Sequence, residues 1–190
     1  MKKRGVFTSA LNGVLSRTMT PKSQIWVETV IYTLIGLTIM GIVISVITPK
    51  INQMTDKAVI EQSIESLNKI NEAFSDILLS SGSQQQVNLL VKRGEYLIDA
   101  IGNRIVFNFK NSNYKYSELN LSFKKIDVYV LTIDQGNKKY DVSLWLNYSY
   151  LNLTYNDKKE NKFLTTAANP YPVVISNIGG IDKRVNIRLV

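Results

Sequence analysis

The pattern of apolar and polar residues changes twice along the chain and predicts three structural segments. From Ile25 to Ile47 the residues are almost all apolar, and Glu28 is the only charged one. A helix of these 23 residues would be roughly 34 Å long, enough to cross a hydrocarbon layer of about 30 Å. After Pro49, apolar residues recur at steps of three and four up to Leu79, as in an amphipathic helix. A polar break at 80–83 follows, and the apolar residues then alternate with polar ones, which is typical of β-strands.

The alternating segments predict a β-sheet domain after residue 80. Expected strands lie at 86–92, 95–101, 104–109, 119–123, 126–133, 140–155 with an interruption, 173–176 and 185–190. Gly102-Asn103 and Gln135-Gly136-Asn137 have the residues that tight antiparallel hairpins require. The phase of the alternation slips near Tyr150, where we expect a bulge or a bend.

These segments together predict an α+β fold. A long N-terminal membrane-spanning helix continues into an amphipathic half, which packs against a C-terminal antiparallel β-sheet head. The expected divisions are a leader at 1–23, a transmembrane helix at 24–48, its amphipathic extension at 49–80 and an extracellular β-rich head at 81–190. Pro49 removes one backbone hydrogen bond and should kink the helix near the outer membrane surface.

The distribution of charge predicts the orientation of the chain and argues against a nucleic-acid partner. The net charge is +8, but the five basic residues of the leader, which precede Gln24 without any acidic residue, supply +5 of it. Positive residues favour the cytoplasmic side of a span, so the leader should lie inside and the head outside. The remaining chain has 18 basic and 15 acidic residues, which does not favour a nucleic-acid partner.

Composition also excludes several kinds of chemistry. The chain has no histidine and no cysteine, so disulfides, thiolate nucleophiles, imidazole bases and the usual zinc or haem ligands are absent. We find no paired acidic motif on adjacent strands, no glycine-rich phosphate loop and no base for a serine nucleophile. Five carboxylates of the amphipathic helix are interpreted as a solvated face and not as a metal site: Asp56, Glu61, Glu65, Glu72 and Asp76. The sequence therefore predicts neither an enzyme nor a bound cofactor or metal.

The junction between the leader and the apolar helix is the most informative part of the sequence. It places basic Lys22, small Ser23 and Gln24 immediately before the apolar segment, with Glu28 four residues after Gln24. A protease at the inner membrane face needs a small residue to admit the scissile bond, and a charged stretch before it to keep that bond out of the lipid. Glu28 enters the membrane at a cost of about 2–3 kcal/mol. The helix dipole, or a freed α-amino group of Gln24 on this or a neighbouring subunit, would offset that cost.

This junction resembles the class III signal peptides of archaeal type IV pilins and archaellins. The resemblance covers roughly residues 17–80 and implies that a prepilin peptidase cuts between Ser23 and Gln24. It further implies that Glu28, five places into the mature chain, takes part in subunit registration and assembly. Three features depart from the family pattern, namely Ser23 in place of glycine or alanine, Trp26 in place of a small or polar residue, and the length of the leader.

The expected function is therefore that of a pilin or pilin-like structural subunit of an archaeal-type surface filament, with a lollipop-like architecture. Its partners would be other pilin subunits, the prepilin peptidase, the membrane and an assembly platform. The precursor would lie in the cytoplasmic membrane with its N-terminus inside, and the assembled subunit at the cell surface. The alternative is an uncleaved, signal-anchored surface protein with a β-rich binding or adhesion domain. Major or minor pilin, archaellin and pseudopilin, and roles in adhesion, motility, secretion or DNA uptake, are all compatible with the sequence.

Three sequons are candidates for glycosylation. Asn120, Asn147 and Asn152 each begin an Asn-x-Ser/Thr sequence on the expected polar phase of a strand. Glycans there would fit an extracellular head. About three such sequons would also arise by chance from the asparagine, serine and threonine content of the chain.

Overall fold

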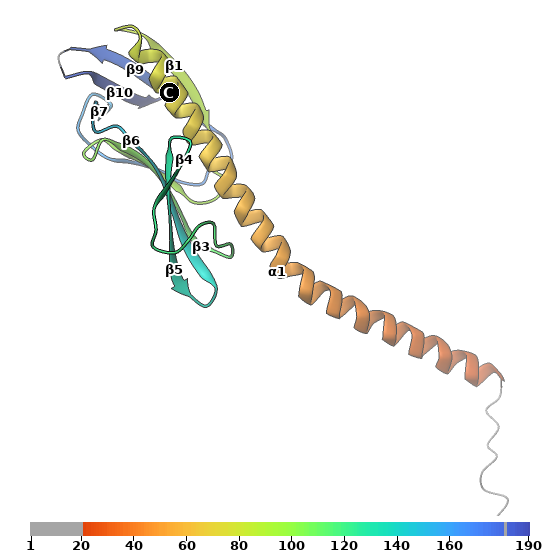
Figure 1. Ribbon diagram of the computed structural model, residues 1–190. Helices are drawn as coiled ribbons and strands as arrows, with labels where there is room; N and C mark the ends of the chain where they lie inside the picture. The colour runs from red at the N-terminus through yellow and green to blue at the C-terminus, as the bar shows by residue number, and fades with distance from the viewer. Residues whose placement is uncertain (1–20, 181) are drawn as a thin grey trace, which may run out of the picture. The chain divides into compact units, whose positions relative to one another are not determined.

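The computed structural model describes residues 21–180 and 182–190, and it contains one long helix followed by ten strands (Figure 1). The helix, α1, runs from Pro21 to Leu78 with Pro49 inside it. The chain divides after Thr48 into two compact units, so the apolar part of α1 and the β-rich head are described separately. Most of the predicted leader, residues 1–20, lies outside the described residues.

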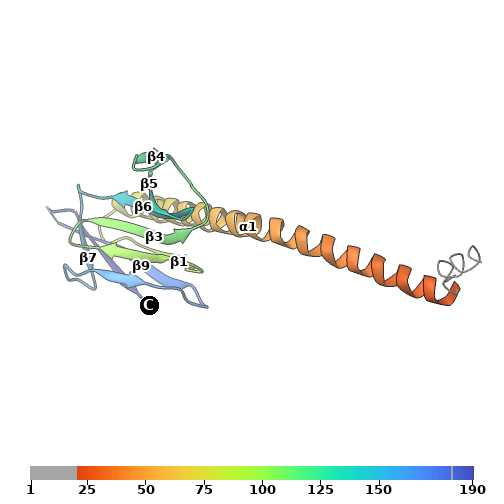
Figure 2. The same ribbon diagram turned by 90° about the horizontal axis from the view of Figure 1, so that it is seen from below.

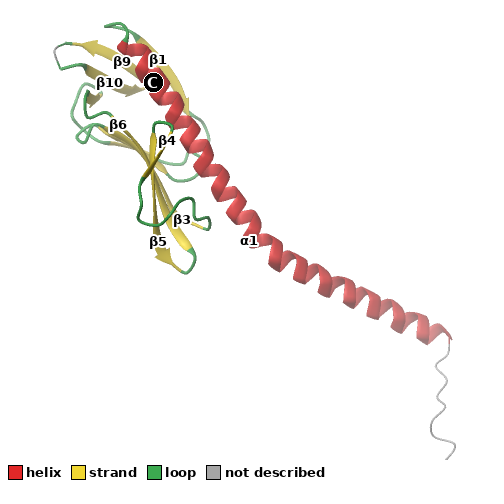
Figure 3. Ribbon diagram, viewed as in Figure 1, coloured by secondary structure: helices red, strands yellow, loops and turns green. Residues whose placement is uncertain are grey.

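The head combines the second half of α1 with two β-sheets, which confirms the predicted α+β class. Its strands are β1 (Gln84–Leu89), β2 (Glu95–Asp99), β3 (Arg104–Ser112), β4 (Phe123–Lys125), β5 (Val128–Gly136), β6 (Lys139–Asn147), β7 (Asn152–Tyr155), β8 (Lys162–Leu164), β9 (Tyr171–Gly179) and β10 (Arg184–Leu189). One sheet has the order β1-β9-β10-β7 and the other β4-β5-β6-β3-β2-β8. Figure 2 and Figure 3 show the strands of both sheets beside the second half of α1. All strand pairs are antiparallel except β10 with β7, which is parallel.

A stripe of apolar side chains along α1 forms the centre of the head's core. Its fully buried members recur at steps of three and four: Ile60, Ile64, Leu67, Ile70, Phe74 and Ile77. Ile70 borders a small internal gap together with Tyr96 and Ile98 of one sheet and Val173 and Ile175 of the other. Phe74 stacks on Tyr148 with ring centroids 4.2 Å apart. Both sheets therefore bury their apolar faces against the same helix, as hydrophobic periodicity requires.

The slip of alternation near Tyr150 marks a chain that changes sheets. β6 belongs to the six-stranded sheet and β7 to the four-stranded one. Between them the chain turns, and the backbone N–H of Leu151 donates to the carbonyl of Tyr148 at 2.8 Å. β6 buries alternate residues, including Leu144 and Leu146, before the turn, and β7 buries Leu153 and Tyr155 after it. The predicted bend is confirmed, and it joins two sheets where the sequence indicated one.

The two hairpins predicted from turn residues are present. Asn103 has a φ of 51° in the turn between β2 and β3. Gly136 pairs with Lys139, so the loop between β5 and β6 consists of Asn137 and Lys138, with φ of 52° and 58°. Two consecutive residues with positive φ are the signature of a type I′ turn, whose twist matches that of the flanking strands.

Two strand predictions were wrong in detail, and one strand was missed. Leu119 makes only an isolated bridge to Thr132, and the strand that follows is the short β4. Ile126 lies in the turn before β5 at a φ of 58°, and the turn is held by the amide of Asn71, which donates to Asp127 at 3.0 Å. β8 was not predicted, because its three residues are too few for a period-two pattern to be visible.

Shortening the central aromatic of the α1 stripe should destabilise the whole head. Phe74→Ala removes a ring that is 1% exposed and stacked on Tyr148, and we expect a loss of about 3–5 kcal/mol in the free energy of unfolding. Denaturant unfolding of the full chain in detergent, followed by the β signal in circular dichroism, measures it. Glu72→Ala, an exposed change one half-turn away, serves as the control; equal midpoints for the two variants would show that α1 is not part of the core.

Candidate functional site

The apolar part of α1 presents its side chains outward around its whole circumference. Large apolar residues from Ile25 to Ile47 are between 37% and 70% exposed. This is the only helix in the described part of the chain that is long and apolar enough to cross a membrane. An isolated surface of this size needs a lipid or protein environment, because apolar area in water costs about 25 cal/mol per Å².

The hydroxyl groups within this segment are hydrogen-bonded inside the helix itself. Thr29, Thr33, Thr38 and Thr48 each donate to the carbonyl four residues earlier, at 2.8–2.9 Å, and Ser45 donates to Ile42 at 2.7 Å. In hydrocarbon an unsatisfied polar group costs several kcal/mol, so local back-bonding makes these residues compatible with lipid. The segment is thus suited to the bilayer by its polar residues as well as by its apolar ones.

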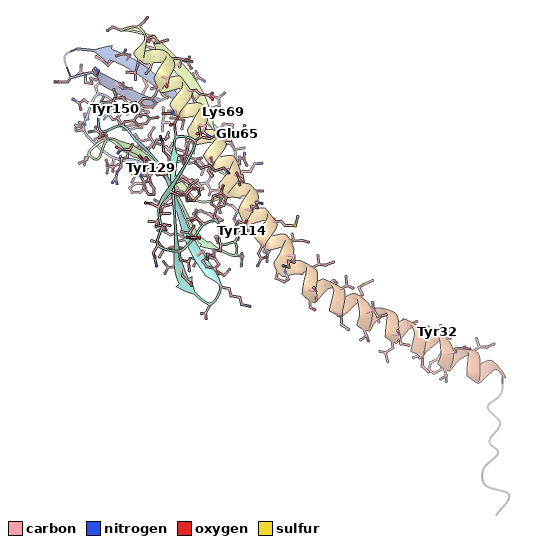
Figure 4. The ribbon with its side chains drawn as sticks, viewed as in Figure 1. Tyr32, Glu65, Lys69, Tyr114, Tyr129 and Tyr150 are labelled. Carbon is pink, nitrogen blue, oxygen red and sulfur yellow. The ribbon has the colours of Figure 1, made fainter. Side chains whose placement is uncertain are left out.

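Glu28 is the exception within this segment. Its Oε1 accepts one hydrogen bond, from the hydroxyl of Tyr32 at 3.4 Å (Tyr32 is labelled in Figure 4). A carboxylate can accept about four hydrogen bonds, so most of its capacity is unused within the described chain. The spacing of four residues between Glu28 and Tyr32 was visible in the sequence, but the contact was not predicted.

The other predicted residues of this region are placed less completely. Lys22, Ser23 and Gln24 lie in the first turn of α1, but their side chains are outside the described part of the structure. Cleavage between Ser23 and Gln24 stays a prediction. Pro49 lies inside α1 at the boundary of the two units, and the kink expected there also stays a prediction.

The structure corrects the interpretation of one helix carboxylate as solvated. Asp56 is completely buried. Its Oδ1 accepts from the guanidinium of Arg93, and its Oδ2 accepts from both the backbone N–H and the side-chain amide of Asn113, each at 2.7 Å. Lys139 donates to the oxygen of that amide at 2.7 Å. Asp56 lies four residues before Ile60, on the buried face of α1, and this spacing was the available signal.

A second carboxylate of α1 is also tied to the head. Glu61 accepts from Lys125 at 2.8 Å and from the hydroxyl of Tyr116 at 2.9 Å. The hydrogen bond from Lys125 is the main reason that the pKa of Glu61 lies below its usual value of 4.5. Glu65, by contrast, lies on the outward face of α1, as the sequence predicted, and pairs there with Lys69 (Figure 4).

The three sequons differ in accessibility. Asn120 is exposed but lies in a turn with a φ of 58°, so its predicted place on a strand was wrong. Asn147 is exposed at the end of β6. Asn152 is half-buried, and its Oδ1 is buried without a hydrogen-bond partner. Asn120 and Asn147 are therefore the better candidates for glycosylation.

Comparisons with protein-family models, curated proteins and solved structures give no match for this chain. Within the described ranges, no three acidic side chains gather in a way that could hold a metal ion. The described chain thus offers an exposed apolar helix with Glu28 and a set of polar contacts that hold α1 to the head.

The contact between Glu61 and Lys125 should make stability depend on acid pH. Because the pKa of Glu61 is lowered in the folded state, its contribution is present above about pH 4.5 and disappears as pH falls through the lower folded-state value. Melting temperatures of the wild type and of Glu61→Gln, measured from pH 7 to pH 3, should differ at neutral pH and converge in acid. A constant difference over the whole range would contradict this linkage.

Proposed function

We propose that this chain is a structural subunit, pilin or pilin-like, of an archaeal-type type IV pilus or related surface filament. The observation that carries the proposal is that one helix, α1, contains both an exposed apolar segment and the buried stripe of the head. α1 is exposed and apolar from Ile25 to Ile47, and within the same run of hydrogen-bonded turns it becomes the buried stripe of the head from Ile60 to Ile77. A helix of this kind anchors a precursor in the bilayer and offers the same apolar surface to neighbouring subunits after assembly.

Glu28 supports assembly over simple anchoring. Its carboxylate has a single hydrogen-bond donor, Tyr32, among the described residues, whereas the hydroxyl groups of the segment are locally satisfied. A carboxylate near the membrane interface is costly unless it is neutralised. In the proposed filament, the α-amino group freed at Gln24 on this or a neighbouring subunit supplies the opposite charge.

The alternative, an uncleaved signal-anchored binding protein, is favoured by one feature of the head. An open groove of about 500 Å³ is lined by Arg93, Glu95, Asn108, Lys110 and Thr165, among others. Its mixture of charged and hydroxyl side chains would suit a polar ligand. The two functions differ in whether the leader is removed.

The first test is the mass of the mature N-terminus. We expect protein sheared from the surface or extracted from membranes of the native cell to begin at Gln24, allowing for N-terminal modification. Tandem mass spectrometry of the N-terminal peptide measures this directly, and Ser23→Asp, which would block the small-residue site, should accumulate precursor. A chain that begins at Met1 in cells with an active prepilin peptidase would favour the signal-anchored alternative.

The second test separates insertion from assembly. Glu28→Ala should leave the precursor in the membrane fraction, because it removes a charge from an apolar helix, and should reduce filament yield at least about tenfold, a change of about 1.4 kcal/mol in subunit association. Filaments are counted by electron microscopy of sheared material. Glu65→Ala, which removes an exposed glutamate outside the span, is the matched control. Normal filament yield from Glu28→Ala would remove the assembly role of this residue.

A further inference from the structure

Three side chains that are far apart in the sequence are linked by consecutive hydrogen bonds at the start of the head. Asp56 comes from α1, Asn113 from the segment directly after β3, and Lys139 from the first position of β6. The amide nitrogen of Asn113 donates to Oδ2 of Asp56 at 2.7 Å, and Nζ of Lys139 donates to the amide oxygen of Asn113 at 2.7 Å. The ring of the adjacent Tyr114, labelled in Figure 4, lies with its centroid 5.8 Å from Nζ of Lys57 on α1.

The chemistry of the neighbours fixes the orientation of the Asn113 amide. A carboxylate accepts hydrogen bonds, and a lysine side chain in its protonated form only donates them. The amide must therefore turn its nitrogen toward Asp56 and its oxygen toward Lys139, as observed. Its carbonyl carbon consequently lies between an amine nitrogen on one side and a carboxylate on the other.

The amine nitrogen of Lys139 is close enough to the side-chain carbonyl carbon of Asn113 for a reaction. Since a C=O bond is about 1.23 Å long, a nitrogen 2.7 Å from the oxygen lies less than about 4 Å from the carbon, within reach of a near-attack geometry after a small rotation. Among the described residues, Lys139 forms no salt bridge with a carboxylate. Loss of its proton therefore breaks no ion pair.

Asp56 lies beside Nδ2 of Asn113, the nitrogen that would leave if the amine of Lys139 attacked the amide. It is fully buried, and Arg93 occupies its Oδ1, which leaves Oδ2 for Asn113. Arg93 is itself placed over the ring of Phe109, 4.9 Å from the centroid. The carboxylate is thus held in one orientation, with Oδ2 accepting from both the backbone N–H and the side-chain amide nitrogen of Asn113.

We propose that Lys139 and Asn113 join in an intramolecular amide bond, with Asp56 as the catalytic residue. The free amine of Lys139 attacks the side-chain carbonyl carbon of Asn113, forming a bond between that carbon and Nζ. Both nitrogens are then on the same carbon, so Asp56 can accept a proton from Nζ and return it to Nδ2. The bond between the carbon and Nδ2 breaks, ammonia leaves, and Asp56 is regenerated. The lysine and the asparagine amide are converted into a secondary amide and ammonia, with no oxidant or cofactor.

The chain contains an internal comparison for this reaction. Lys159 donates to the side-chain oxygen of Asn103 at 2.8 Å, nearly the same separation as in the proposed site. In the described residues, however, no carboxylate accepts from the amide nitrogen of Asn103, and its oxygen also accepts from the backbone of Leu153 at 3.0 Å. This second pair has the amine and the amide without the acid, so it should remain unreacted.

The bond would reinforce the head where α1 enters it. It would connect the segment after β3 to the start of β6 and close a loop between residues 113 and 139, beside the buried Asp56. A cross-link that closes a loop of this length restricts the unfolded chain as a disulfide does. The chain has no cysteine, so an amide is a covalent link that its own residues can form.

The test is the mass of the purified, folded full-length protein. We expect a mass about 17 Da below that calculated for its N-terminus and sequence, the mass of one ammonia lost. Proteolytic digestion should give one branched peptide that joins Lys139 to Asn113, while the peptides containing Lys159 and Asn103 should remain separate. Because the loss does not depend on where the N-terminus lies, the result is independent of leader processing and of filament formation.

Two variants complete the experiment. Lys139→Arg keeps a cation at this half-buried position and should restore the full calculated mass, with a melting temperature lower by about 10 °C. Lys159→Arg is the matched control and should keep the loss of about 17 Da. Asp56→Asn should also abolish the loss if it folds, and circular dichroism reports whether it does. A folded wild-type protein with its full calculated mass, or a cross-link between any other pair of residues, would overturn the proposal.

Discussion

The structure of the head depends on the burial of one apolar stripe on α1. Ile60, Leu67 and Ile77 are at most 1% exposed, and the gap beside Ile70 is bordered by residues of both sheets. Neither sheet alone can cover its own apolar face, because the helix is the surface that both share. The consequence is that α1 and the strands must fold together.

Polar contacts at the two ends of this stripe fix how the helix lies on the sheets. At the start, Asp56 receives hydrogen bonds from Arg93 and Asn113. At the end, the amide of Asn177 on β9 donates to the carbonyl of Ile77 at 2.9 Å and so satisfies one of the last carbonyls of α1. Apolar packing is tolerant of small sliding, whereas buried polar groups lose much free energy when they are misaligned. These contacts therefore specify the register that the apolar stripe alone leaves free.

The sequence predicted those features that follow from local periodicity, and missed those that depend on contacts between distant residues. The apolar segment, the stripe on α1 and the turns at Asn103 and Asn137 each reflect a repeat or a dipeptide that is visible locally. The division into two sheets is not local, since β7 pairs in parallel with β10, more than 30 residues later. The interpretation of Asp56 as solvated was wrong because Asp56, four residues before Ile60, lies on the buried face of α1, where groups far away in the sequence satisfy its carboxylate. The resemblance to pilins likewise rests on a local pattern, within residues 17–80.

Two carboxylates on α1 differ in how fully the described chain satisfies them. Asp56 is buried, and the head supplies hydrogen bonds to both of its oxygens. Glu28 has only the hydroxyl of Tyr32 at 3.4 Å, although it belongs to the more apolar part of the same helix. An unpaired charge in apolar surroundings costs free energy, whether it lies in a protein core or in a membrane, unless an opposite charge or hydrogen-bond donors compensate it. The described residues offer no cation to Glu28; in the filament proposed above, the α-amino group freed at Gln24 or a group of another subunit would supply the opposite charge. Of these, another subunit would also cover the apolar side chains that surround Glu28, so a single contact would meet both requirements.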